Sequence, residues 1–94
     1  MSKPSYTSAA YGDLASILRY ISRDNATAAL DWVDKIEAKC LLIAHNPQMG
    51  ELRPEFGENV RSTTVGRYVI FHRETDSGVR ILRVIPGDMD ITNL

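Results

Sequence analysis

Two histidines are the side chains best suited to acid–base chemistry in this sequence. His72 lies in an apolar run beside Arg73 and Glu74, where an imidazole could act as a general base. His45 falls at the end of an expected helix, where its charge would interact favourably with the helix dipole. A single histidine at either kind of position is more often structural, and we interpret both in this way. Because the only cysteine, Cys40, belongs to an apolar helix pattern, we expect no metal site, disulfide or cofactor.

Arginine side chains are concentrated in the second half of the chain. Between residues 60 and 87 the sequence holds five arginines and two acids, which gives this segment a net charge of +3. The arginines are Arg61, Arg67, Arg73, Arg80 and Arg83, and the acids are Glu74 and Asp76. Arginines on a sheet can bind phosphate groups or the carboxylates of an acidic partner. The alternative is a polar sheet face that is balanced by acids elsewhere. Tyr68 could stack on a nucleic-acid base, although a strand tyrosine is more often a packing residue.

The composition describes one small domain, which we place at residues 1–94. Hydrophobic residues make up 44% of the chain and charged residues 24%, as is ordinary for a globular domain. The net charge of -1 argues against direct binding to nucleic acid. The longest apolar run, residues 40–44, is far too short to span a membrane, and the start of the chain shows no secretory signal. We therefore expect a cytoplasmic protein without a membrane segment.

Helical patterns fill the first half of the chain. Apolar residues spaced for one helix face predict a helix over 9–22, with Ser8 as its N-cap. A second stripe predicts a helix over 26–45, capped by Asp24 or Asn25 and ended by Asn46-Pro47. The short connection favours an antiparallel helical hairpin. Before it, residues 3–7 could form an edge strand, and after it, residues 47–59 hold two prolines and two glycines and are expected to be a loop.

Strand patterns fill the second half. We expect strands over 60–65, 67–75 and 79–85, the last two joined as an antiparallel hairpin by the turn Asp76-Ser77-Gly78. Alternation places Val69 and Phe71 on one face of their strand and Tyr68 and Ile70 on the other. Together the elements predict an α+β fold, in which an N-terminal helical hairpin packs on a small, mainly antiparallel sheet.

Both faces of this sheet are expected to be apolar. In the last strand, alternation pairs Leu82 with Val84 on one face and Ile81 with Ile85 on the other. Two helices can cover only one of the two faces. The loop and the tail, or a partner protein, must therefore cover the second face.

The order of the elements and several motifs resemble the RelE/ParE toxins of bacterial toxin–antitoxin systems. Matching motifs open the first helix at residues 8–14 and end it at Tyr20-Ile21. Further matches are the turn Asn46-Pro47-Gln48-Met49-Gly50 and the strand motifs at residues 60–61, 65–73 and 81–84. The resemblance covers nearly the whole chain and implies the same α+β fold.

Within this superfamily the sequence is similar to the ParE branch, which poisons DNA gyrase, blocks replication and is neutralised by ParD antitoxins. The RelE branch instead cuts mRNA on the ribosome, using basic residues and a histidine or tyrosine near the last strand and tail. Here the tail after Ile85 contains no His, Tyr, Lys or Arg, and a slightly acidic chain is poorly suited to ribosomal RNA. The resemblance therefore implies a non-enzymatic toxin, with a ParD-like antitoxin as its partner and DNA gyrase as its target.

The tail differs from that of many ParE-like chains, which carry a histidine before the terminal glycine and an arginine shortly after it. This chain has Pro86-Gly87-Asp88-Met89-Asp90 at that place. Two alternatives follow. One is a ribosome-dependent endoribonuclease that would use Arg61, His72 and Arg83. The other is an adaptor of the same fold that binds a partner without toxicity.

The expected antitoxin-binding site combines arginines with apolar residues of the sheet. An uncovered apolar face would bind an amphipathic segment of the antitoxin, and the arginines would pair with its acids. We assign to this site Arg61, Tyr68, Phe71, Arg73, Arg83 and Ile85, and we assign no catalytic or metal-binding residue.

Overall fold

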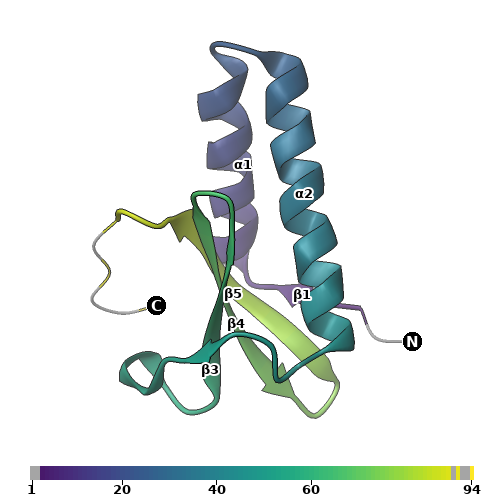
Figure 1. Cartoon of the computed structure of the whole chain (residues 1–94), viewed down its shortest axis with the longest axis vertical. Helices are drawn as coiled ribbons and strands as arrows, with labels where there is room; N and C mark the ends of the chain where they lie inside the picture. Colours follow the sequence, from purple (N-terminus) through teal and green to yellow (C-terminus); the bar gives the residue numbers. More distant parts are fainter. Residues whose placement is uncertain (1–2, 90, 92–93) are drawn as a thin grey trace.

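The fold is an α+β arrangement in which a helical hairpin packs on a five-stranded sheet (Figure 1). The computed structural model describes residues 3–89, 91 and 94, so Asp90 of the tail motif lies outside the described residues. The elements are β1 (Ser5–Tyr6), α1 (Ser8–Ser22), α2 (Ala26–His45), β2 (Glu51–Leu52), the 3-10 helix η1 (Pro54–Phe56), β3 (Val60–Val65), β4 (Tyr68–Thr75) and β5 (Gly78–Pro86). The predicted fold class is confirmed.

Side-chain caps define where both helices begin. Thr7 caps α1, because its Oγ1 accepts a hydrogen bond from the Ala10 backbone N–H at 3.0 Å. The prediction of Ser8 as the cap was therefore wrong by one residue, and Ser8 is the first residue of the helix. Asn25 caps α2 by accepting from the Ala28 N–H at 3.0 Å, and α2 spans the predicted range.

The sheet has the strand order β1-β5-β4-β3-β2, with β1 parallel to β5 and the other neighbours antiparallel. The predicted edge strand near the N-terminus is confirmed as the shorter β1. The segment 47–59, predicted to be a loop, also contains β2 and η1. Periodicity could not reveal β2, because a two-residue strand is shorter than one repeat of a recognisable alternation.

A bulge in β5 corrects the predicted faces of this strand. Ile70 pairs with Val84 and Phe71 with Arg83, but His72 pairs with Ile81, so Leu82 is the additional residue. An extra residue shifts the alternation, and Ile81 therefore shares the helix-facing side with Val84. Leu82 and Ile85 lie together on the opposite side, contrary to the prediction.

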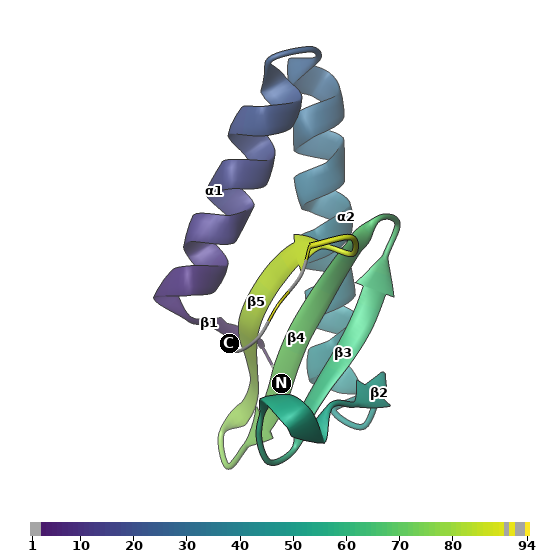
Figure 2. The ribbon, with the colours of Figure 1, turned by 90° about the vertical axis from the view of Figure 1, so that its left-hand side faces the viewer.

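Each face of the sheet has its own apolar cluster, and the two are covered by different parts of the chain. The helices cover one face, where Ile36, Ile70 and Ile81 are fully buried. On the other face, which we call the far face, Val60, Phe71 and Ile85 are buried beneath partly buried side chains. These include Phe56 of η1 and Ile91 and Leu94 of the C-terminal segment. Figure 2 shows the helices and η1 on opposite sides of the sheet. The loop and the tail therefore cover the second apolar face, one of the two predicted solutions.

Candidate partner-binding site

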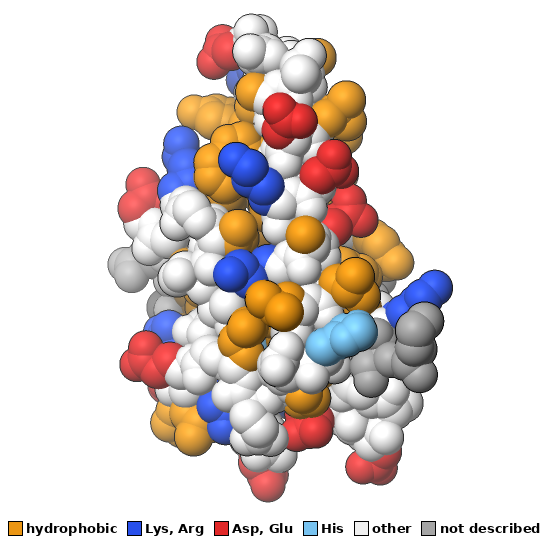
Figure 3. Space-filling view, turned by 45° about the vertical axis from the view of Figure 1, so that its right-hand side comes forward, with side chains coloured by type: hydrophobic (Ala, Val, Ile, Leu, Met, Phe, Trp, Pro, Cys, Tyr) orange, Lys and Arg blue, Asp and Glu red, His pale blue; other side chains and the backbone are white. Residues whose placement is uncertain are grey.

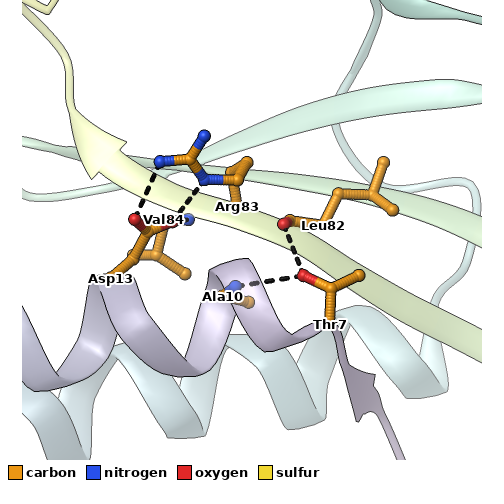
Figure 4. Close-up of polar contacts among 6 residues, drawn as sticks. All are labelled: Thr7, Ala10, Asp13, Leu82, Arg83 and Val84. Atoms are coloured by element: carbon orange, nitrogen blue, oxygen red, sulfur yellow. Dashed lines mark hydrogen bonds and ion pairs between the residues drawn. The ribbon is translucent and has the colours of Figure 1, made fainter.

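A polar junction fixes α1 against the outer edge of β5 (Figure 4). Asp13 Oδ2 accepts hydrogen bonds from Arg83 Nε at 2.7 Å and from the Val84 N–H at 2.9 Å, and its Oδ1 accepts from Arg83 Nη2 at 2.9 Å. Thr7 Oγ1 donates to the Leu82 carbonyl at 2.8 Å. Thr7 and Asp13 bind the Leu82 carbonyl and the Val84 N–H at this edge of β5. A partner strand therefore cannot pair there without breaking these hydrogen bonds.

Beside this junction, α1 and the end of β5 enclose a hollow of about 300 Å³, which we call the α1–β5 hollow. Its apolar lining includes Ile17 of α1, Tyr68 of β4 and Val84 of β5. Tyr20 and Met89 also line it and are 62% and 52% exposed, respectively. The remaining lining includes Asp13, Ser16, Arg67 and Arg83.

Two further hollows lie on the far face, and we call them the arginine grooves. The larger, of about 340 Å³, is lined by Thr7, Phe56, Arg73, Leu82, Arg83 and Leu94, together with Ala9. The smaller, of about 190 Å³, includes Arg53, Phe71, Ile85 and Ile91 in its lining. No aspartate or glutamate is among the described residues that line either groove. The far face therefore combines an apolar floor with guanidinium groups.

The arginines of these grooves are held by local contacts. The Arg53 guanidinium lies 5.2 Å from the ring centre of Phe56 and 5.6 Å from that of Phe71. It also forms an exposed ion pair with Glu55 at 2.9 Å. Arg73 Nε donates to the Glu58 carbonyl at 3.1 Å. These contacts set the direction of each guanidinium and leave donors for a partner, since an arginine has five N–H groups.

Five of the six residues predicted for the antitoxin-binding site line these hollows, which lie on both sides of the sheet. Arg73 and Arg83 line the larger arginine groove, and Phe71 and Ile85 the smaller one. Tyr68 lines the α1–β5 hollow, as do Arg83 and Ile85. Tyr68, Phe71 and Ile85 are nevertheless buried, so they form the floor of these hollows rather than an open contact surface.

Arg61 lies apart from the other predicted residues. Its Nη1 donates to the Gly50 carbonyl at 3.1 Å, and its Nη2 donates to Gln48 Oε1 at 2.9 Å. These bonds hold the turn that follows α2. Arg61 does not join Arg83, which lies at the outer edge of β5.

His72 is fully buried between the sheet and the helices. Its Nε2 lies 2.8 Å from Thr63 Oγ1, and its Nδ1 has no hydrogen-bond partner among the described residues. Burial, with the nearby charge of Arg61 as a second cause, lowers the pKa of His72 to about 4. The ring is therefore neutral at neutral pH and out of reach of a substrate.

Cys40 is also fully buried, and burial raises the pKa of its thiol to about 11. Among the described residues, no three His, Cys, Asp or Glu side chains gather as ligands for a metal ion. None of the helices formed by those residues combines the length and the apolar character that crossing a membrane requires.

Sequence reasoning missed Asp13, Arg53 and Phe56. Arg53 and Phe56 fall in the segment predicted to be a loop, where no periodic pattern indicates which way a side chain points. Asp13 did carry a signal, because it is an acid beside the apolar face formed by Ala10, Leu14 and Ile17. An acid in such a position needs a partner, which Arg83 supplies.

Exposed apolar side chains on the face that carries α2 are scattered among the described residues. Several leucines are exposed there, among them Leu30, Leu41 and Leu42. Figure 3 shows hydrophobic side chains on this face interspersed with basic and acidic ones rather than gathered into one large patch. Scattered exposed apolar residues of this kind are normal for a protein surface.

Comparisons with known proteins agree with this architecture. Residues 5–91 match the family model of the ParE toxin of the type II toxin–antitoxin system parDE. A solved structure of the chromosomal ParDE TA system from P. aeruginosa superposes with a TM-score of 0.74 and 24% sequence identity, covering 92% of this chain and 96% of that one. At this identity the likeness shows the fold. No curated protein matches this chain by sequence.

Proposed function

The chain belongs to the ParE toxin family of type II toxin–antitoxin systems, and from this premise we propose that it arrests growth by inhibiting DNA gyrase and is neutralised by a ParD-like antitoxin. It would act in the cytoplasm, where the sequence predicts that it resides. The observation that carries the antitoxin part of the proposal is the far face, where arginine grooves overlie an apolar floor.

The chemistry of the far face favours an acidic, amphipathic segment. Its apolar side chains would fill the grooves above Phe71 and Ile85, and its carboxylates would pair with Arg53, Arg73 and Arg83. Strand addition at the edge of β5 is disfavoured, because Thr7 and Asp13 already bind the edge groups of that strand. A helical segment lying in the grooves is therefore the better fit.

The buried position of His72 favours a toxin that acts by binding its target and not by acid–base catalysis. A general base must come within hydrogen-bond distance of the group that it deprotonates, and His72 is fully buried. Arg61 and His72 pair across β3 and β4, while Arg83 lies on β5 and binds Asp13 of α1. These positions disfavour the alternative of a ribonuclease that would use Arg61, His72 and Arg83 together.

The gyrase part of the proposal is tested with purified components. Supercoiled plasmid, DNA gyrase and ATP are incubated with the toxin, and protein-linked cleaved plasmid is measured after detergent and protease treatment. We expect cleaved plasmid to accumulate with toxin concentration and to fall when antitoxin is added. Unchanged supercoiling activity and an absence of cleaved plasmid at saturating toxin would contradict a gyrase poison.

The antitoxin part is tested with a charge reversal in the larger groove. Arg73→Glu should weaken the binding of the ParD-like antitoxin by tenfold or more, since it replaces an attraction by a repulsion. Arg23→Glu, on an exposed arginine at the end of α1, is the matched control and should change the affinity less than about twofold. Isothermal calorimetry measures both, and equal affinities for the two variants would place the antitoxin elsewhere.

A further inference from the structure

The α1–β5 hollow has the composition of a protein contact site. Its rim carries the exposed side chains of Tyr20 and Met89, and its wall includes Ile17 and Val84. Tyrosine, methionine and arginine are enriched at the centres of protein interfaces. A volume of about 300 Å³ lies at the lower end of the range for ligand sites and accommodates a large aliphatic or aromatic side chain.

The charges around this hollow favour an acidic occupant. The exposed Arg67 guanidinium lies 5.7 Å from the ring centre of Tyr68 and makes no ion pair with any described residue. Asp13 is the one carboxylate among the described residues that line the hollow, and Arg83 and the Val84 N–H already bind it. Among the described residues that line the hollow, an entering carboxylate therefore meets an unpaired guanidinium and no unpaired acid.

The hollow and the arginine grooves share lining residues around the end of β5. Arg83 lines both the hollow and the larger groove, and Ile85 and Met89 line both the hollow and the smaller groove. A chain segment that leaves the far face across these shared residues would enter the hollow on the helix side of the sheet.

We propose that the α1–β5 hollow is a second anchoring site for the antitoxin, which receives a large apolar side chain flanked by a carboxylate that pairs with Arg67. This inference rests on the proposed function, because its occupant is the same acidic segment that binds the far face. The segment wraps around the end of β5 and thereby holds α1 and the sheet from two sides.

The test fills the hollow without removing any of its proposed contacts. Ser16 is an exposed residue of α1 that lines the hollow, and Ser16→Trp would place an indole where the antitoxin side chain should enter. The control is Ala15→Trp, because Ala15 is the neighbouring exposed residue of α1 and does not line the hollow. A second variant, Arg67→Glu, reverses the charge that should pair with the antitoxin carboxylate. Because Arg67 is exposed, this variant still tests the second anchoring site if Ser16→Trp fails to fold. Calorimetry with the ParD-like antitoxin gives the affinity, and growth arrest on induction gives the toxicity.

We expect Ser16→Trp and Arg67→Glu each to weaken antitoxin binding by tenfold or more, with Ala15→Trp within twofold of the parent chain. If Arg73→Glu weakens binding but both hollow variants bind as tightly as the parent, the second anchoring site is wrong and the far-face site stands. If the hollow variants keep antitoxin affinity but lose toxicity, the hollow serves the target instead and the inference is overturned. If the parent chain does not bind the antitoxin, the proposed function itself fails.

Discussion

At the scale of single residues, the neutral, buried ring of His72 makes folding sensitive to acid. An Nε2–H tautomer donates to Thr63 Oγ1 and leaves Nδ1 as a bare acceptor, which a proton would turn into a buried, unpaired donor. The pKa of His72 is about 4 in the folded chain and 6.5 when unperturbed. Between these two pH values the unfolded state binds a proton that the folded state does not, so stability falls as the pH falls.

This pH dependence is the first prediction. Lowering the pH from 7 to 4 should remove up to about 3 kcal/mol of folding free energy through His72 alone. Carboxylates add their own acid dependence, and His72→Gln is therefore compared with the parent chain by urea unfolding across this range. The variant should lose about 3 kcal/mol less than the parent. Identical pH profiles would show that the protonation of His72 does not control acid unfolding.

The second prediction at this scale concerns the turn between β3 and β4. Gly66 has a φ of +57°, and a Cβ there would collide with the Trp32 ring. Gly66→Ala should destabilise the fold by about 1–3 kcal/mol, since the left-handed backbone costs an alanine about 1 kcal/mol and the ring must also move. Gly12→Ala is the matched control, because a Cβ on Gly12 of α1 meets nothing within 4 Å. This control should stabilise the helix by up to about 1 kcal/mol, and chemical denaturation distinguishes the two effects. A Gly66→Ala protein as stable as the parent would contradict the close packing of this turn.

At the scale of elements, long periodic patterns predicted the helices and strands well, and short or irregular features were missed. The helix over 26–45 and the strands β3, β4 and β5 are confirmed, and the helix and β4 follow the predicted apolar periodicity most closely. The bulge at Leu82 could not be predicted, since it depends on pairing with β4 rather than on the sequence of β5. For the same reason β2 and η1 escaped prediction, as they form where the chain folds back on β3.

The residues of the candidate site were likewise predicted only in part. The sequence predicted Arg73 and Arg83 for the antitoxin-binding site, and both line the larger groove. It also grouped Arg61 with them, but Arg61 instead binds the turn at Gln48 and Gly50. A long arginine side chain can reach several elements, so tertiary contacts decide which of them it binds.

The prediction at this scale tests the junction between α1 and β5. Asp13 has 14% of its side chain exposed and accepts three hydrogen bonds, two of them from Arg83. Asp13→Ala should cost about 2 kcal/mol of folding free energy, because it leaves Arg83 and the Val84 N–H without their partner. Asp24→Ala, at an exposed acid in the turn between the helices, should change stability by less than about 0.5 kcal/mol. Thermal or urea unfolding compares them, and equal stability of the two variants would mean that this junction does not hold α1 on the sheet.

At the scale of the whole molecule, the candidate binding surfaces lie around the end of β5. The far-face grooves and the α1–β5 hollow meet at the end of β5, where Arg83 lies between them. In the proposed function the chain binds its target and its antitoxin as proteins through such surfaces, and the fully buried His72 and Cys40 take no part. We therefore predict that growth arrest results from binding to a target protein and not from cleavage of RNA.

The most direct measurement follows DNA and protein synthesis in parallel in cells induced to express this chain alone. Labelled thymidine reports replication, and labelled amino acids report translation. We predict that thymidine incorporation falls first and that amino-acid incorporation declines later. Co-expression of the antitoxin should restore growth. If translation falls first, a ribonuclease explains the arrest and the gyrase proposal is wrong. If neither falls, the chain is an adaptor with a toxin's fold, and the central claim is contradicted.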